Sequence, residues 1–325
     1  MNAAVRNAQR LFHKWPNFLR ISHSFYRCKG NKTHEIKLED KECIVVYVLV
    51  KGLIPIGWDP FPRKFEGYEV DVRECMPIKM FFRSVGSGML NIWSPVGTLQ
   101  SPVPGQSNDL LALTAGHVFL SKDETDKNSK DNNSDAFHER KTSKGYQQIK
   151  EDSDIEIVFG NLTINGGEDI AHADVAVVQL ESPLTSFETL WNELGLTREP
   201  TFDVHAEQCD DVRNGDIVMK YGETTKITLG RVKALEGAYD NRLGFIEIES
   251  YKNRVFSEPG DSGAYVYVLN KNMLLEEEKE DDSRFTEGKD AFLIGTIHGG
   301  NEDTIYCTKM IANLEGLRKF TNLMR

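Results

Sequence analysis

The pattern of apolar and polar positions divides the chain into a short amphipathic start and a long series of β-like runs. Near the start, apolar side chains recur every three or four positions and predict a helix over residues 3–15, which Pro16 ends or kinks near Trp15. Runs rich in β-branched and apolar residues then predict strands at 19–28, 43–51 and 67–74. We therefore expect residues 1–75 to form a small α/β module.

From residue 76 onward, short β-like runs alternate with Gly, Asn, Asp and Pro. This pattern is typical of mainly β proteins built as barrels or as a sandwich. Residues 311–324 place apolar side chains at helical spacing and predict a C-terminal helix. Two polar stretches, 121–154 and the acidic run 276–282, predict solvated loops inserted between strands.

Charge narrows the classes of partner. The chain has 39 basic and 50 acidic residues, a net charge of −11, which argues against nucleic acid because Lys and Arg supply most phosphate-backbone affinity. Its longest wholly apolar run, Cys43–Val50, is far shorter than the roughly 20 residues of a spanning helix, so we expect no membrane span.

Although the chain as a whole is acidic, residues 1–34 hold seven Lys or Arg and no acid. They are either a mitochondrial transit peptide or the first elements of the module, where the basic helix would bind a regulatory partner; we favour the module.

The cysteines bear on the compartment. The five cysteines are odd in number and widely spaced, and they include no CxxC pair of the kind that holds zinc or does redox chemistry. A secreted protein of this size usually shows an even, paired set. We therefore expect reduced thiols and a cytoplasmic location, with a mitochondrial location as the alternative.

Three short motifs carry candidate chemistry. Leu113–His117 ends a β-run with a histidine, Asp174 opens a buried strand 57 residues later, and Ser262 lies in the turn Gly-Asp-Ser-Gly after 88 more. A serine hydroxyl needs a base to become a nucleophile, and histidine titrates near neutrality. A buried aspartate orients such a histidine and stabilises the imidazolium that forms. Asp169 is a rival for the acid, but it lacks the apolar run that follows Asp174.

In these motifs and their order, the chain resembles the chymotrypsin-like (trypsin-clan) serine proteases. The resemblance implies that His117 is the general base, Asp174 the orienting acid and Ser262 the nucleophile. It also implies an oxyanion hole formed by the backbone N–H groups of Gly260 and Ser262. The implied fold is mainly β, with two six-stranded antiparallel barrels at about 76–195 and 200–310, followed by the C-terminal helix and preceded by the small α/β module.

The same resemblance implies where substrate binds. Phe256 lies six residues before Ser262, where an acid would confer a trypsin-like preference, so cleavage after Arg or Lys is disfavoured. We predict substrate contacts from Phe256, Ser257, His298, Gly299 and Gly300. Phe256 either leaves a shallow apolar pocket or fills it. His298 either hydrogen-bonds Asp174 or, with Ser257, favours an acidic substrate residue.

One departure from the family affects activation. The chain contains no Arg/Lys-Ile-Val-Gly-Gly activation sequence, so Asp261 has no newly cut amino terminus as a partner. The sequence leaves open whether the turn around Ser262 forms constitutively or needs a ligand or partner. We expect a serine endopeptidase that acts on proteins or peptides through an acyl-enzyme, without metal or cofactor. The alternative is a catalytically quiet or partner-gated protease fold that serves as a peptide-binding module.

Overall fold

The computed structural model describes most of the chain. The described residues are 1–29, 37–75, 79–80, 99–100, 110–120, 123–125, 136–143, 150–164, 169–180, 194–198, 200–203, 211–239, 242–252, 254–274, 282–285, 287–301 and 304–320. Nearly all of the predicted acidic loop 276–282, and much of the predicted loop 121–154, lie outside them.

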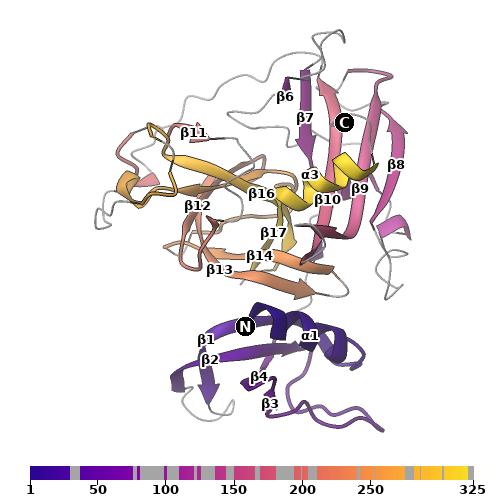
Figure 1. The fold of residues 1–325 in the computed structure, drawn as a ribbon, viewed down its shortest axis with the longest axis vertical. Helices are drawn as coiled ribbons and strands as arrows, with labels where there is room; N and C mark the ends of the chain where they lie inside the picture. The colour runs from indigo at the N-terminus through magenta and orange to yellow at the C-terminus, as the bar shows by residue number, and fades with distance from the viewer. Residues whose placement is uncertain are drawn as a thin grey trace.

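The elements follow the mainly β pattern that the sequence predicts, with helices near the two ends (Figure 1). In chain order they are α1 (Asn2–Phe12), β1 (Phe18–Lys29), β2 (Lys37–Val48), β3 (Lys64–Phe65), β4 (Tyr68–Glu74), β5 (Lys79–Met80), β6 (Leu99–Gln100), β7 (Leu110–Thr114), the 3-10 helix η1 (Gly116–Phe119), β8 (Phe137–Thr142), β9 (Asp154–Ile164), β10 (Asp169–Leu180), β11 (Phe202–Asp203), β12 (Ile217–Gly222), β13 (Lys226–Tyr239), β14 (Arg242–Ser250), β15 (Tyr265–Leu269), the 3-10 helix η5 (Lys271–Met273), β16 (Ala291–Gly300), β17 (Ile305–Lys309) and α3 (Met310–Phe320).

The C-terminal half forms a closed antiparallel barrel of six strands. Its order is β12-β15-β16-β17-β14-β13, and the pairing of β12 with β13 closes the ring. Every residue of β15 and β16 is buried, which explains why these strands are apolar runs without polar alternation. The barrel core contains residues such as Val218, Val266 and Ile294. One of the two predicted six-stranded barrels is therefore present.

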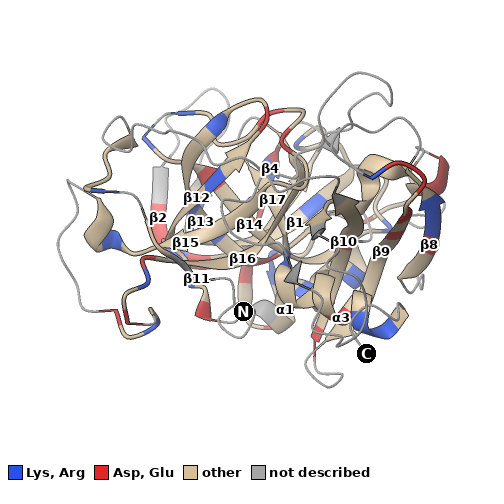
Figure 2. Ribbon diagram, turned by 90° about the horizontal axis from the view of Figure 1, so that it is seen from above, with Lys and Arg blue, Asp and Glu red and all other residues tan. Residues whose placement is uncertain are grey.

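The other sheet is an open one in the part of the chain that the structure describes. It has five antiparallel strands in the order β6-β7-β10-β9-β8, so the prediction of a second closed six-stranded barrel is not met there. The edge strand β8 alternates partly buried and exposed residues, and charged residues lie along it (Figure 2). Arg140 and Lys141 on this strand pair with Glu156 and Glu124. Charged side chains keep such an edge from pairing further.

The N-terminal strands extend the sheet of the barrel. Strand β1 pairs with β13 through Arg20↔Tyr239 and Ile21↔Ala238, and β2 lies between β1 and the parallel strand β4. Helix α1 buries Val5, Ala8 and Phe12 against these strands. The helix ends at Phe12, three residues before the predicted end, because Trp15 turns to stack on Phe61 and donates its indole N–H to the Asp59 carbonyl at 2.9 Å. The division of the chain at residue 75 stays a prediction.

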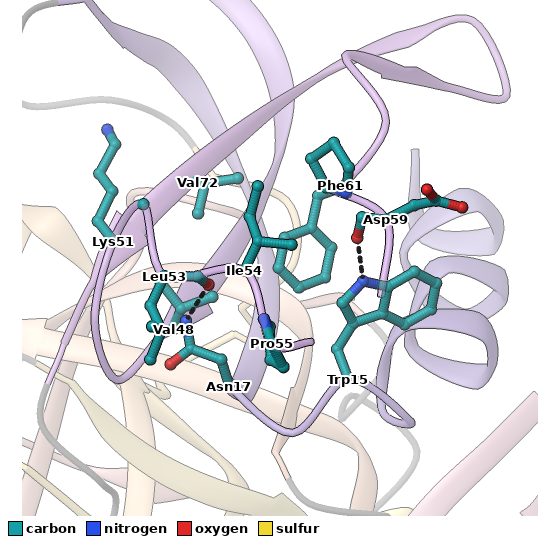
Figure 3. A pocket seen from close by; sticks show the side chains of 12 residues that line it. Trp15, Asn17, Val48, Lys51, Leu53, Ile54, Pro55, Asp59, Phe61 and Val72 are labelled. Atoms are coloured by element: carbon teal, nitrogen blue, oxygen red, sulfur yellow. Dashed lines mark hydrogen bonds between the residues drawn. The ribbon is translucent and has the colours of Figure 1, made fainter. Parts of the chain in front are cut away.

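The N-terminal region also contains a cavity. A cavity of about 230 Å³ lies between the segment after α1 and residues 51–61, lined by apolar side chains such as Trp15, Ile54 and Phe61 (Figure 3). Asn17 holds its wall by donating to the carbonyls of Val50 and Leu53. Among the described residues, no helix is long and apolar enough to cross a membrane.

Candidate active site

Three segments from different strands meet where the barrel contacts the five-stranded sheet. Strand β7 ends at Thr114 and runs into η1, which carries His117; Asp174 lies in the middle of β10; Ser262 lies in the turn before β15. Two glycines permit the approach. A Cβ on Gly116 would lie 2.9 Å from the Val175 carbonyl oxygen, and one on Gly263, whose φ is +82°, would lie 2.2 Å from Thr114 Oγ1. Only glycine fits either position without moving the backbone.

The three side chains form one hydrogen-bonded chain. Ser262 Oγ lies 3.0 Å from His117 Nε2, and His117 Nδ1 lies 2.6 Å from Asp174 Oδ2. The other oxygen of Asp174 accepts the backbone N–H of His117 at 2.8 Å. Because a carboxylate only accepts, His117 donates from Nδ1 and presents Nε2 as the acceptor for the serine hydroxyl. All three side chains are buried.

A second histidine binds the same carboxylate. His298 on β16 donates from Nδ1 to Asp174 Oδ2 at 2.5 Å, so the hydrogen bond that was one of two sequence alternatives is present. Burial lowers the pKa of His298 to about 4, although Asp174 acts in the opposite direction. Burial also acts to raise the pKa of Asp174, but His117 and His298 outweigh it and hold that pKa well below its usual range. At neutral pH, Asp174 is an anion and His298 is a neutral donor.

Aromatic rings and a polar helix residue enclose this carboxylate. The His298 ring packs against His172 and Phe245 at centroid distances of 5.4 and 5.1 Å. Burial holds the pKa of His172 well below its usual range, so this ring too is neutral. Asn313 of α3 accepts the backbone N–H of Asp174 at 3.0 Å and donates to Thr296 on β16. Helix α3 therefore fixes the strand position of Asp174 relative to the barrel.

The cluster also has the donor spacing of a metal site. Ligand-type atoms of His117, Asp174 and His298 all lie within 4.8 Å of one another. Both histidines direct Nδ1 at the same carboxylate oxygen, so hydrogen bonds account for the spacing. Nothing in the geometry requires an ion there.

The other predicted site residues are placed as follows. Gly260 has a φ of +108°, and a Cβ there would lie 2.3 Å from Thr224 Oγ1, so the turn needs a glycine. The Phe256 side chain is buried in the barrel core. Ser257 is buried, and its hydroxyl lies 3.4 Å from Asp261 Oδ2. Gly299 and Gly300 are buried at the end of β16, where they pair with Tyr306 and Ile305. The rival acid Asp169 pairs with Arg6 at 3.0 Å.

Sequence reasoning missed two residues that support this site. Lys220 lies 3.1 Å from Asp261 Oδ2 with both side chains fully buried, and Asn313 contacts the backbone of Asp174. Each had a visible signal. Lys220 interrupts the apolar run that begins at Ile217, and Asn313 lies among the apolar positions of the terminal helix. A polar residue at a position patterned for burial indicates a specific partner.

A Ser–His–Asp chain between a closed antiparallel barrel and a second antiparallel sheet is the arrangement of the chymotrypsin-like serine proteases, and this protein is one of that class. Within the class, the model of peptidase family S64 matches residues 104–279, which is more than half of the chain. The chain belongs to peptidase family S64. It is a serine protease, a hydrolase, and its substrates are proteins or peptides.

Solved structures with similarity to the chain include several serine proteases. A Nocardiopsis protease (NAPase) is 18% identical, with 66% of this chain and 84% of that chain covered at a TM-score of 0.31. A glutamic acid-specific serine protease that uses a histidine triad in substrate binding is 14% identical, with 66% and 86% covered at a TM-score of 0.30. Cellulomonas bogoriensis chymotrypsin is 18% identical, with 47% and 68% covered at a TM-score of 0.24. No curated protein matches the chain.

Proposed function

We propose that this protein is a serine endopeptidase in which Ser262 is the nucleophile, His117 the general base and Asp174 the orienting acid. The observation that carries the proposal is the continuous hydrogen-bonded chain from Ser262 Oγ through both ring nitrogens of His117 to Asp174. The position of His117 between a hydroxyl donor and a carboxylate acceptor is the one a general base needs. His298 assists as a neutral donor that leaves the negative charge of Asp174 in place.

The reaction follows from these positions. Ser262 Oγ attacks the carbonyl carbon of the scissile peptide as its proton passes to His117 Nε2. The oxyanion of the tetrahedral intermediate accepts hydrogen bonds from the backbone N–H groups of Gly260 and Ser262, and each such donor lowers the barrier by about 3–4 kcal/mol. The C–N bond then breaks, His117 returns the proton to the leaving amine, and an acyl-enzyme remains.

Water completes the cycle. His117 takes a proton from a water molecule as its oxygen attacks the acyl carbon, and the proton returns to Ser262 Oγ when the carboxylic acid product leaves. Asp174 stays ionised throughout and stabilises the imidazolium of each half-reaction. Every bond and proton is handled by the chain or by water, so the proposal needs no metal or cofactor.

Substrate preference and architecture belong to the same proposal. Phe256, Ser257, His298, Gly299 and Gly300 are proposed to shape the substrate site, and the missing acid at position 256 supports a preference other than Arg or Lys. The buried position of Phe256 supports the alternative in which it fills the pocket. We also propose that the protease region is built from two barrels, the first at about 76–195 and the second at about 200–310.

The proposal also covers the location of the protein and its regulation. We propose that residues 1–34 begin a folded module of a cytoplasmic protein rather than a cleaved transit peptide. Support comes from the burial of α1 against β1 and β2. Exposed Arg10 and Lys14 on the basic segment remain available to a regulatory partner. Amino-terminal sequencing of the protein from its host tests the first point, since removal of residues within 1–34 would contradict it.

A fluorophosphonate probe tests the chemistry directly. Wild-type protein should be labelled at one serine, and Ser262→Ala should abolish the label. Peptide-library profiling of the same pair should show turnover by wild type alone and reveal the preferred residue. Labelling that persists in Ser262→Ala would refute the assignment of Ser262. Peptide binding that is equal in both proteins, without turnover, would instead support a catalytically quiet binding module.

A further inference from the structure

The residue immediately before Ser262 is a fully buried carboxylate with an unusual number of partners. Asp261 Oδ1 accepts the backbone N–H groups of Thr224 and Thr225 at 2.8 and 3.2 Å. Asp261 Oδ2 accepts the Thr225 hydroxyl at 2.6 Å and the Glu258 N–H at 3.1 Å. These contacts tie the turn of Ser262 to the hairpin between β12 and β13. A nearby cation stabilises such a buried carboxylate further, because burial away from water disfavours its charged form.

Lys220 on β12 supplies that cation. Its ammonium lies 3.1 Å from Asp261 Oδ2, and neither side chain has any exposed area. The same ammonium donates to the Thr225 hydroxyl and to the Lys226 carbonyl, the latter at 3.2 Å. Asp261, Thr225 and Lys226 thus account for its three protons. The cation is held at one point, beside the turn that carries Ser262.

The backbone around the pair shows how tightly it is placed. A Cβ on Gly222, at the end of β12, would lie 2.2 Å from Asp261 Oδ1, so any larger residue at position 222 would clash with the carboxylate. Within the turn, Asp261 N–H donates to the Glu258 carbonyl at 3.0 Å, and Gly263 N–H donates to Ile297 of β16 at 2.9 Å. These bonds hold the turn that carries Ser262 against the barrel wall.

We propose that Lys220 is a positioning residue whose ammonium takes the place of a cleavage-generated amino terminus, so that the turn from Gly260 to Gly263 is formed without proteolytic activation. The inference rests on the proposed function, because the turn matters only if Ser262 attacks substrate. It answers the question that the missing activation sequence raises: Asp261 has an internal partner in the uncut chain. Without the cation, Asp261 is a buried charge that has lost its ion-pair partner, which is strongly destabilising. We expect Asp261 to move toward water and to displace the adjacent backbone N–H groups of the turn.

Titration of Lys220 gives the pair a pH dependence. Burial lowers the pKa of Lys220 to about 8, while the carboxylates of Asp261 and Glu258 act in the opposite direction. The neighbouring strands present no further charge opposite it, since its cross-strand partners are Val266 on β15 and Thr228 on β13. As pH rises through about 8, Lys220 loses its proton and the ion pair is lost. Activity should therefore fall on the alkaline side, and an arginine at this position, which stays charged, should remove that fall.

The test compares full-length wild type with Lys220→Met, Lys220→Arg and the exposed-lysine control Lys289→Met. Rates of fluorophosphonate labelling are measured from pH 6 to 10, and hydrogen exchange is followed at the amides of Thr224, Thr225, Glu258 and Asp261. We expect Lys220→Met to label on the order of 100-fold more slowly, as expected when oxyanion donors are misplaced. Lys220→Arg should stay within about tenfold at pH 7 without the alkaline fall. The four amides should exchange faster in Lys220→Met alone.

The outcomes separate this inference from the proposed function. Wild type without Ser262-dependent labelling refutes the proposed function, and the exchange measurement then still decides the role of Lys220. Folded Lys220→Met that labels at the wild-type rate, or shows unchanged exchange at the four amides, overturns the inference. If Lys220→Met does not fold, the comparison of wild type with Lys220→Arg decides: the same alkaline fall in both proteins overturns the inference, and its loss in the arginine variant supports it.

Discussion

Two buried polar clusters contact the Phe245 ring, one around Asp174 and one around Arg20. The ring packs against His298 of the first cluster at 5.1 Å and against Tyr306 of the second at 5.5 Å. In the Asp174 cluster, a single carboxylate is bound by donors such as neutral His298. In the Arg20 cluster, which comprises Arg20, Ser22, Tyr47, Glu247 and Tyr306, a full cation faces a full anion.

The Arg20 cluster joins the N-terminal strand to the barrel. Arg20 is 1% exposed, donates to the Tyr306 hydroxyl at 2.7 Å and lies 3.7 Å from Glu247 Oε2. Its guanidinium also covers the Tyr47 ring at 3.6 Å. Replacing such a pair by apolar packing is often neutral or even stabilising, but losing either partner alone is expensive. The cluster therefore secures one arrangement of strands.

The Asp174 cluster is organised differently because the charge of Asp174 must stabilise the imidazolium that forms when His117 takes a proton. Neutral donors hold the carboxylate without neutralising it, so the charge remains available to an imidazolium. Two clusters with similar burial therefore serve two purposes. Hydrogen bonds from neutral donors leave the charge of Asp174 available to a protonated His117, whereas the ion pair of Arg20 with Glu247 already has its charges matched and serves to hold the strands together. Substitutions should therefore separate activity from stability.

The largest expected effect is the loss of activity in Asp174→Asn. The amide keeps the size of the side chain but cannot orient the His117 tautomer or stabilise its cation, so kcat should fall about 10⁴-fold. The free energy of unfolding should change far less, by up to about 2 kcal/mol. Peptide hydrolysis and urea denaturation of the same preparations measure the two quantities. A fall in kcat below tenfold would contradict the comparison.

Arg20→Met should show the reverse, a large loss of stability with little change in chemistry. It leaves Glu247 buried without its cation and should cost about 3–5 kcal/mol in the free energy of unfolding. Activity per folded molecule should stay near wild type.

The double variant Arg20→Met with Glu247→Gln is the control for that prediction. Because it removes the orphaned charge, it should be more stable than the sum of the two single changes by about 0.5–3 kcal/mol. Strict additivity in the urea midpoints would show that the pair does not act as a unit.

The next largest effect is a loss of unfolding free energy in mild acid, which arises from the histidines around Asp174. The folded pKa of His298 is about 4, below the ordinary 6.5, so between these values the unfolded chain binds a proton that the folded chain does not. Stability is therefore full above about pH 6.5 and falls by about 3 kcal/mol as pH decreases toward 4. His172, whose pKa is also lowered, acts in the same direction. Urea denaturation at a series of pH values should show a shallower slope in His298→Asn, and an unchanged slope would count against this assignment.

The smallest expected effect is that of Tyr306→Phe. It keeps the ring contact with Phe245 and removes only the hydroxyl that accepts from Arg20. The expected cost is about 1 kcal/mol of unfolding free energy, with kcat unchanged. Thermal unfolding and peptide hydrolysis test it together. If kcat fell tenfold or more, the two clusters would be coupled through Phe245 rather than independent.

Much of the fold could be read from local pattern. The apolar run at 43–51 predicted β2, the alternation of apolar and charged residues at 67–74 predicted β4, and the helical spacing after residue 310 predicted α3. The end of α1 was harder, since Trp15 left the helix for partners far along the chain. Among the described residues the sheet that contains Asp174 is open, whereas a second closed barrel was predicted; closure depends on edge pairing, which no local pattern encodes.

The candidate site divides in the same way. The motifs that contain His117, Asp174 and Ser262 were visible because each places a reactive side chain at a strand edge or a glycine turn. The partners Lys220 and Asn313 were overlooked, although each is a polar residue in an apolar run. Their function depends on which strand or turn they face, and that information is not local.

The sequence by itself determined the β-rich fold class and the order of His, Asp and Ser, because burial periodicity and turn chemistry act over a few residues. Only the tertiary structure decided which buried polar and charged groups meet. It placed His298 on Asp174, Arg20 against Glu247, and Lys220 beneath the turn that carries Ser262. Those pairings are electrostatic and join residues distant in the chain, so they exist only once the barrel, the open sheet and the N-terminal strand have packed together.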